Sequence, residues 1–156
     1  MIQINVKNKS KITVYDDRNI VYTMIRNTPL LSFKTYGEIF EGDNKIGKIQ
    51  LGIFFKKQIL YQSFFEKINI IKQQLYMTDF LIDENQIRIK NNPFFFFNKK
   101  IFSKIYFNSE LIAIVSMRDI LDLEGYNLDI KFLVENKQIE KYSVLCYLIC
   151  CIEFNV

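Results

Sequence analysis

The chain has 156 residues, of which 49% are apolar and 24% charged, and its formal net charge is +4. This composition is typical of one globular domain, so we expect a single domain over residues 1–156. The chain contains no His, which excludes a Ser-His-Asp triad, a Cys-His pair, a His-ligated metal and a His pH switch. The basicity comes from 17 Lys and only 4 Arg, a profile that codon bias also produces, so it gives weak support for an anionic partner.

From the start to about residue 133, short apolar runs alternate with polar pairs, which is typical of strands joined by hairpins. The clearest turn is Glu41-Gly42-Asp43-Asn44, because Gly and Asn tolerate the positive φ that tight turns require. Polar residues at 16–19, 83–86 and 108–109 predict three more hairpins. The expected strands are 2–6, 12–14, 20–24, 33–40, 46–54, 76–82, 87–89, 101–107, 111–117 and 126–134.

The segment after residue 135 changes character. Asn136 is a candidate helix N-cap, and Glu140 lies near the positive end of the helix dipole. Residues 144–152 are nine consecutive apolar residues, which a helix must bury on every side. Nine residues fall short of the roughly 20 that cross a bilayer. The sequence therefore predicts a helix over about 137–154 inside the protein. A buried strand is the rival interpretation, and length and the capping signal favour the helix.

All three cysteines, Cys146, Cys150 and Cys151, lie in this apolar segment. An odd number in one segment argues against a disulfide framework and fits a reducing compartment. The first residues alternate apolar and polar types and lack the apolar core of a signal peptide, so we expect a cytoplasmic protein. We interpret the cysteines as packing residues, because three thiols without a fourth ligand nearby do not make a zinc site. No metal or cofactor is predicted.

The order of these segments resembles a known plan. The resemblance is carried by Val21-Tyr22-Thr23-Met24, Lys34 to Phe40, Asn44 to Ile49, Ile112 to Val115, Tyr126 to Ile130 and the apolar C-terminal segment. In this plan the chain is similar to the tubby C-terminal-like superfamily, which includes the LURP-one-related proteins and the phospholipid scramblases. The Asp-x-x-Gly turn of that superfamily is replaced here by Glu41-Gly42-Asp43-Asn44.

The resemblance implies a closed antiparallel β-barrel threaded by the C-terminal helix. Because barrel diameter grows with strand number, about twelve strands would enclose a lumen wider than their own side chains fill, and an apolar helix would fill it. The predicted fold class is therefore mostly β, or α+β by element count: a barrel or meander of about 12 antiparallel strands enclosing an apolar C-terminal α-helix. The resemblance also implies lipid binding, although neither the phosphoinositide-binding residues of tubby proteins nor a scramblase calcium motif can be placed on this sequence.

Paired carboxylates are the candidates for acid and base chemistry. They occur at Asp16-Asp17, at Asp83-Glu84, and at Asp122 with Glu124. All three pairs fall at predicted turns, where Asp is favoured by local hydrogen bonding. The sequence has no Gly-rich phosphate loop, nucleophile elbow or metal-spaced cluster. We expect no catalytic residues and no enzymatic activity.

Two clusters join aromatic residues to lysine pairs, and such a pairing suits either anionic lipid headgroups or single-stranded nucleic acid. It also arises in a barrel where alternate Phe side chains point inward and lysines protect strand edges, which is the simplest interpretation. Four consecutive Phe cannot all face one side of a strand, so at least one or two must be exposed or covered by a loop. The clusters are Phe54-Phe55-Lys56-Lys57, and Phe94, Phe95, Phe96 and Phe97 with Lys99 and Lys100.

Two classes of function remain. The first is a non-enzymatic binding module for anionic phospholipid headgroups or a membrane surface, which would use Lys56, Lys57, Lys99 and Lys100 on one face. The second is a structural or protein-interaction domain, for example a homo-oligomer that uses Phe94 to Phe97 as its contact. Nucleic acid is the least favoured partner, and the sequence does not predict an oligomeric state.

Overall fold

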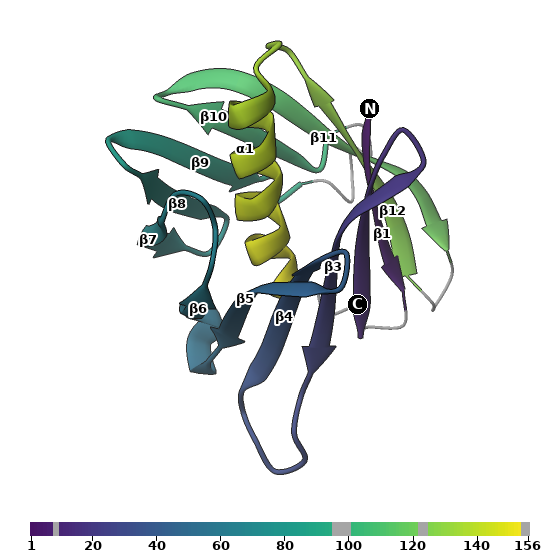
Figure 1. Ribbon diagram of the computed structural model, residues 1–156, viewed down its shortest axis with the longest axis vertical. Coiled ribbons are helices and arrows are strands. Elements are labelled where there is room, and N and C mark those ends of the chain that lie inside the picture. Colours follow the sequence, from purple (N-terminus) through teal and green to yellow (C-terminus); the bar gives the residue numbers. More distant parts are fainter. Residues whose placement is uncertain (8–9, 95–100, 122–124, 154–156) are drawn as a thin grey trace.

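The computed structural model describes residues 1–7, 10–94, 101–121 and 125–153. Twelve antiparallel strands form one sheet that closes almost completely into a barrel around a C-terminal helix (Figure 1). The first six strands are β1 (Ile2–Lys7), β2 (Lys11–Asp16), β3 (Asn19–Asn27), β4 (Thr35–Glu41), β5 (Asn44–Leu51) and β6 (Lys57–Gln62). The other six are β7 (Ile68–Gln74), β8 (Met77–Ile82), β9 (Asn85–Asn91), β10 (Ser103–Phe107), β11 (Glu110–Leu121) and β12 (Gly125–Phe132). The helical elements are η1 (Ile53–Phe55), α1 (Lys137–Cys150) and η3 (Cys151–Glu153).

The strand order is β6-β5-β4-β3-β2-β1-β12-β11-β10-β9-β8-β7. Each neighbouring pair is also consecutive in sequence except β1 and β12, which pair with Ile2 opposite Ile130 and Lys7 opposite Gly125. The two edge strands of the sheet are therefore β6 and β7, although they follow one another in the chain. We call the line between β6 and β7 the seam.

The predicted hairpins are confirmed as two-residue turns at 17–18, 42–43, 83–84 and 108–109. Inward and outward residues alternate along most strands, as in β1, where Ile2, Ile4 and Val6 are buried. Two strand boundaries differ from the prediction. The strand expected over 46–54 ends at Leu51, because Phe54 and Phe55 adopt a left-handed backbone within η1. The strand expected from residue 33 begins at Thr35, so Phe33 lies in the preceding loop.

The C-terminal segment is a helix, as its capping signal predicts. The side chain of Asn136 accepts hydrogen bonds from the backbone N–H groups of Gln138 and Ile139, at 3.1 Å each. Residues 142–152 are all buried, and Figure 1 shows the helix enclosed by the strands. The α-helix ends at Cys150 and continues as η3 to Glu153, so it is shorter than expected. Within the described residues, no helix combines the length and apolar character needed to cross a bilayer.

Candidate functional site

The meander sends alternate connections to opposite ends of the barrel, because successive strands run in opposite directions. The β3–β4, β5–β6, β7–β8 and β9–β10 connections lie at one end, together with η3. We call this the loop end. The tight hairpin turns described above lie at the other end, together with the start of α1. We call this the turn end; the start of α1 and most of these turns lie in the upper part of Figure 1.

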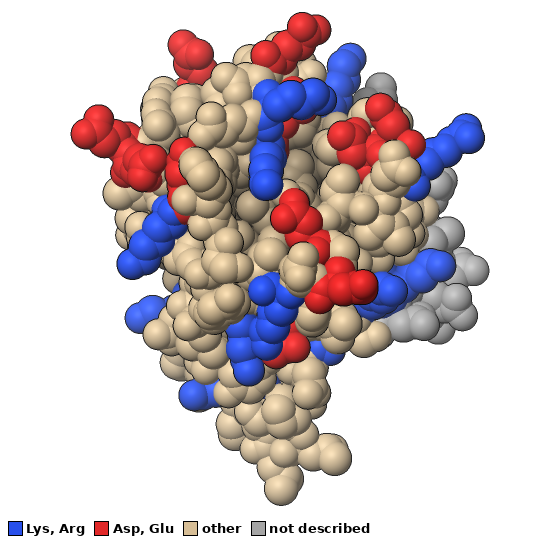
Figure 2. All heavy atoms as spheres, viewed as in Figure 1, with Lys and Arg blue, Asp and Glu red and all other residues tan. Residues whose placement is uncertain are grey.

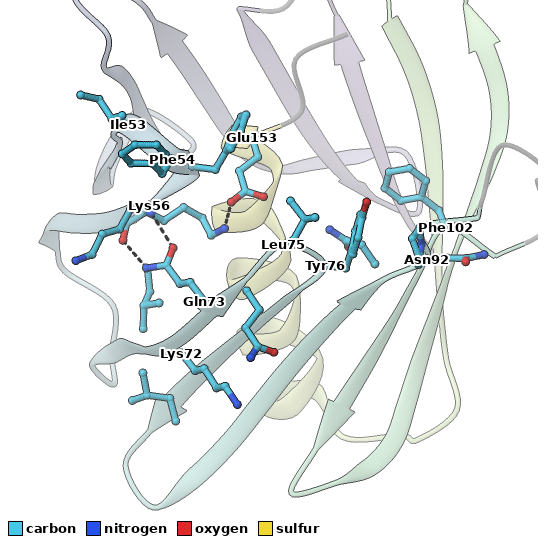
Figure 3. A pocket seen from close by; sticks show the side chains of 17 residues that line it. Ile53, Phe54, Lys56, Lys72, Gln73, Leu75, Tyr76, Asn92, Phe102 and Glu153 are labelled. Atoms are coloured by element: carbon cyan, nitrogen blue, oxygen red, sulfur yellow. Dashed lines mark hydrogen bonds and ion pairs between the residues drawn. The ribbon is translucent and has the colours of Figure 1, made fainter.

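A pocket of about 920 Å³ lies at the loop end, between the first residues of β6 and the last residues of β7. We call it the seam pocket. Much of its wall is apolar and aromatic, and Figure 3 shows Leu75 and Tyr76 facing Phe54 and Glu153 across it. Its lining consists of residues 53–57, 70–76 and 91–93 with Phe102 and Glu153.

Two glutamine side chains bridge the seam where backbone pairing is missing. The Gln73 carboxamide accepts from the Lys57 N–H at 2.7 Å and donates to the Lys57 carbonyl at 2.9 Å (Figure 3). Further along the seam, the Gln62 carboxamide accepts from the Ile68 N–H at 2.8 Å and donates to the Ile68 carbonyl at 3.0 Å. Each carboxamide thus takes the place of one peptide group of a neighbouring strand. The seam pocket lies beside the Gln73 bridge.

A buried ion pair forms one wall of the pocket. The Lys57 ammonium group binds the Glu153 carboxylate, and only 2% of the Lys57 side chain and 20% of the Glu153 side chain are exposed (Figure 3). We expected Lys57 to face an anionic surface, and this placement is wrong. As the first residue of β6, Lys57 points inward to the end of η3, where it neutralises Glu153.

Lys56 and Lys72 are the remaining cations of the pocket, and both are exposed. In the part of the chain that the structure describes, neither has a carboxylate within ion-pair distance. Because Glu153 is already neutralised by Lys57, the charge that the pocket presents to a ligand is positive. Phe54 beside Lys56 is 93% exposed, so an aromatic ring and an ammonium group stand together at the rim.

The second basic-aromatic cluster is only partly described. Phe94 is exposed and follows Pro93, which lines the pocket. Phe95, Phe96, Phe97, Lys99 and Lys100 lie outside the described residues. A common face for Lys56, Lys99 and Lys100 therefore stays a prediction, without Lys57.

The two ends of the barrel differ in the residues that hold a left-handed backbone. At the turn end these positions carry Gly42 or polar residues, mostly Asp and Asn, which tolerate it: Asp17, Arg18, Asp83, Asn108 and Ser109. At the loop end they carry Leu31, Phe54 and Phe55, with φ of 68°, 61° and 58°. A left-handed backbone costs a bulky L residue roughly 1–2 kcal/mol. Turn geometry therefore does not explain why these three positions are large and apolar.

Sequence reasoning missed a group of exposed side chains in the β3–β4 connection. Leu30, Leu31 and Phe33 are 98%, 104% and 87% exposed. The sequence does contain a signal for them, in Pro29-Leu30-Leu31-Ser32-Phe33. Pro29 indicates a loop, and apolar residues in a loop between strands are expected to be exposed because they do not face the core. Lys72 was also missed, since β7 did not stand out in the sequence.

Two of the three carboxylate pairs considered for catalysis lie at the surface of the turn end. Asp16 and Asp17 lie beside the N-terminal ammonium group at the turn end, and Asp83-Glu84 forms an exposed turn. Asp122 and Glu124 are outside the described residues. Burial raises the pKa of all three cysteine thiols, that of Cys150 to about 12, so these thiols are protonated and weakly nucleophilic at neutral pH. Among the side chains that the structure describes, no cluster has the make-up of a metal site.

Comparison of the chain with protein-family models, with curated proteins and with solved structures gives no match.

The Lys57–Glu153 pair gives a first testable expectation. Glu153→Leu should lower the free energy of unfolding by about 3 kcal/mol, because it leaves the buried Lys57 ammonium group without its partner. The double variant Lys57→Met/Glu153→Leu should recover most of that loss, since it removes both charges and keeps apolar bulk. Urea denaturation of the parent and the three variants, including Lys57→Met, measures both effects. A double variant as unstable as Glu153→Leu would contradict a coupled ion pair.

Proposed function

We propose that the protein is a non-enzymatic binding module for an anionic lipid, and that the seam pocket is its binding site. The observation that carries this proposal is the pairing of an exposed apolar wall with Lys56 and Lys72, which have no ion-pair partner among the described residues, in one concavity. An apolar wall favours a hydrocarbon chain, and the lysines favour a negative headgroup at its end. The volume of about 920 Å³ lies within the roughly 300–1,000 Å³ of small-molecule sites.

The fold is compatible with this proposal. A nearly closed barrel of twelve strands with one C-terminal helix has the architecture of a tubby-like barrel, so we propose a distant relationship to that superfamily and to its lipid-binding members. The three cysteines are free thiols, which agrees with the cytoplasmic location expected from the sequence.

Short-chain phosphatidic acid, used below its micellar concentration, tests the pocket without a membrane. We expect binding to the parent, and a roughly thirtyfold loss of affinity in Lys56→Gln/Lys72→Gln, because each of the two lysines contributes on the order of 1 kcal/mol to contact with an anionic lipid. Titration calorimetry measures the affinity, with short-chain phosphatidylcholine as the neutral ligand. The matched control is Lys67→Gln/Lys131→Gln, which removes the same charge from two exposed lysines nearer the turn end.

Equal affinity of both double variants for phosphatidic acid would contradict a lipid site at the seam pocket. The competing function is a structural or protein-interaction domain. It predicts no binding to short-chain lipid or to vesicles, together with self-association that analytical ultracentrifugation detects.

A further inference from the structure

The β3–β4 loop is the part of the barrel that projects furthest at the loop end, as Figure 1 shows. It spans residues 28–34 and has a defined conformation. The Ser32 N–H donates to the Pro29 carbonyl at 3.0 Å, which closes a β-turn with Leu30 and Leu31 at its two central positions. The Thr28 and Thr35 hydroxyls are 2.9 Å apart at the base of the loop.

The tip of this loop is apolar, although one of its apolar residues has an unfavourable backbone conformation. Leu31 occupies the third position of the β-turn with a positive φ, where Gly or Asn is the usual residue. Leu30, Leu31 and Phe33 are nearly or fully exposed, so none of them gains stability from the core. An unfavourable backbone at a fully exposed apolar residue suggests that these side chains serve contact with something outside the chain.

Net charge differs between the two ends of the barrel, because carboxylates gather at the turn end and outnumber the cations there, which are Arg18, Lys45, Lys67, Lys137 and Lys141. The exposed lysines around the loop end include Lys7 at the end of β1, Lys11 at the start of β2, Lys34 and Lys56 in connections, and Lys72 near the end of β7. In the described connections at this end and in η3, Glu153 is the one carboxylate, and Lys57 neutralises it. Figure 2 shows most carboxylates in the upper part of the visible face and an uncharged protrusion at the bottom. The carboxylates of the turn end are Asp16, Asp17, Glu41, Asp43, Glu66, Asp83, Glu84, Glu110, Glu135 and Glu140.

We infer that the barrel docks end-on onto an anionic lipid bilayer, with Leu30, Leu31 and Phe33 inserted among the lipids. This inference rests on the proposed function for the choice of lipid as partner, and it adds a second contact surface distinct from the seam pocket. A bilayer fits the convex tip because acyl chains accept apolar side chains without a complementary cavity. The lysines around the loop end face the headgroups, while the carboxylates of the turn end face away from them.

The chain contains no Trp, so a single introduced Trp reports the depth of one position. In Leu31→Trp, vesicles of phosphatidylcholine with 30% phosphatidylserine should shift the emission to shorter wavelength, and brominated lipids should quench it at least twofold. The matched control is Phe65→Trp, because Phe65 is 93% exposed in the connection between β6 and β7 at the turn end. Its emission should stay unchanged. Equal responses at the two positions, or no response at Leu31→Trp, would overturn end-on docking.

Two further variants separate this inference from the proposed function. Leu30→Asn/Leu31→Asn/Phe33→Asn should lose at least tenfold in vesicle affinity and bind short-chain phosphatidic acid like the parent, since these residues do not line the pocket. Leu31→Gly should bind vesicles more weakly and unfold at the same or a higher temperature, because Gly relieves the positive φ. Vesicle binding that the triple variant leaves intact would overturn the inference alone. Absence of phosphatidic acid binding in the parent would count against the seam pocket.

Discussion

Gly125→Ala is expected to disrupt the pairing of β1 with β12 and to lower the free energy of unfolding by on the order of 3 kcal/mol. Gly125 has a φ of +146°, and a Cβ atom at this position would lie 1.8 Å from the Val6 carbonyl oxygen and 2.9 Å from the Val6 carbonyl carbon. Both are backbone atoms of β1, so no side-chain movement relieves the clash. The strands must separate, and this pair joins the two halves of the meander.

Gly42→Ala is the matched control for that change. Gly42 also has a positive φ, of 58°, but a Cβ atom there would meet nothing within 4 Å. Its cost is therefore limited to the left-handed backbone, about 1 kcal/mol. Urea denaturation followed by circular dichroism compares the two variants. Similar midpoints for both would show that the close approach at Gly125 does not limit stability.

Leu148→Asp should abolish the soluble, folded protein. Leu148 is fully buried near the middle of the buried part of α1, and the side chains next to it in sequence, Tyr147 and Ile149, are equally buried. An unpaired carboxylate in such surroundings costs several kcal/mol, against a total stability of only about 5–15 kcal/mol. Soluble yield and thermal unfolding measure the effect.

Gln138→Asp places the same carboxylate in the same helix as a control. Gln138 is exposed in the first turn of α1, where a negative charge interacts favourably with the helix dipole. The change also removes the exposed hydrogen bond from the Gln138 carboxamide to the Glu66 carboxylate, at 2.8 Å, so it should lower the melting temperature slightly and leave the yield of folded protein unchanged. An unchanged melting temperature for Leu148→Asp would contradict the burial of α1 inside the barrel.

The central helix and the hairpins could be predicted because their signals are local. Asn136 caps α1 through its own side chain, and nine consecutive apolar residues require burial whatever surrounds them. Gly42 and its polar neighbours define a turn without reference to the rest of the chain.

The seam could not be predicted, because its strands lack a clear alternation. Along β6 only Lys57 is buried, and its partner Glu153 lies 96 positions further along the chain. Nothing local distinguishes a lysine that pairs at such a distance from one that faces solvent. The role of Gln62 and Gln73 in bridging β6 and β7 could not be predicted either, since nothing in the sequence distinguishes a glutamine that bridges two strands from one that faces solvent. The seam pocket could therefore be recognised only in the folded structure. The sequence did single out the basic-aromatic cluster Phe54-Phe55-Lys56-Lys57, which lines it.

The position of α1 in the chain bears on the order in which the molecule assembles. The helix follows all twelve strands in sequence, yet it lies inside them. During synthesis, nothing fills the lumen until α1 has been made after the last strand, so the strands cannot close tightly before then. Closure must then occur around the helix. The seam provides a natural place for that last step, because β6 and β7 come together through two side-chain bridges instead of a full ladder of backbone bonds.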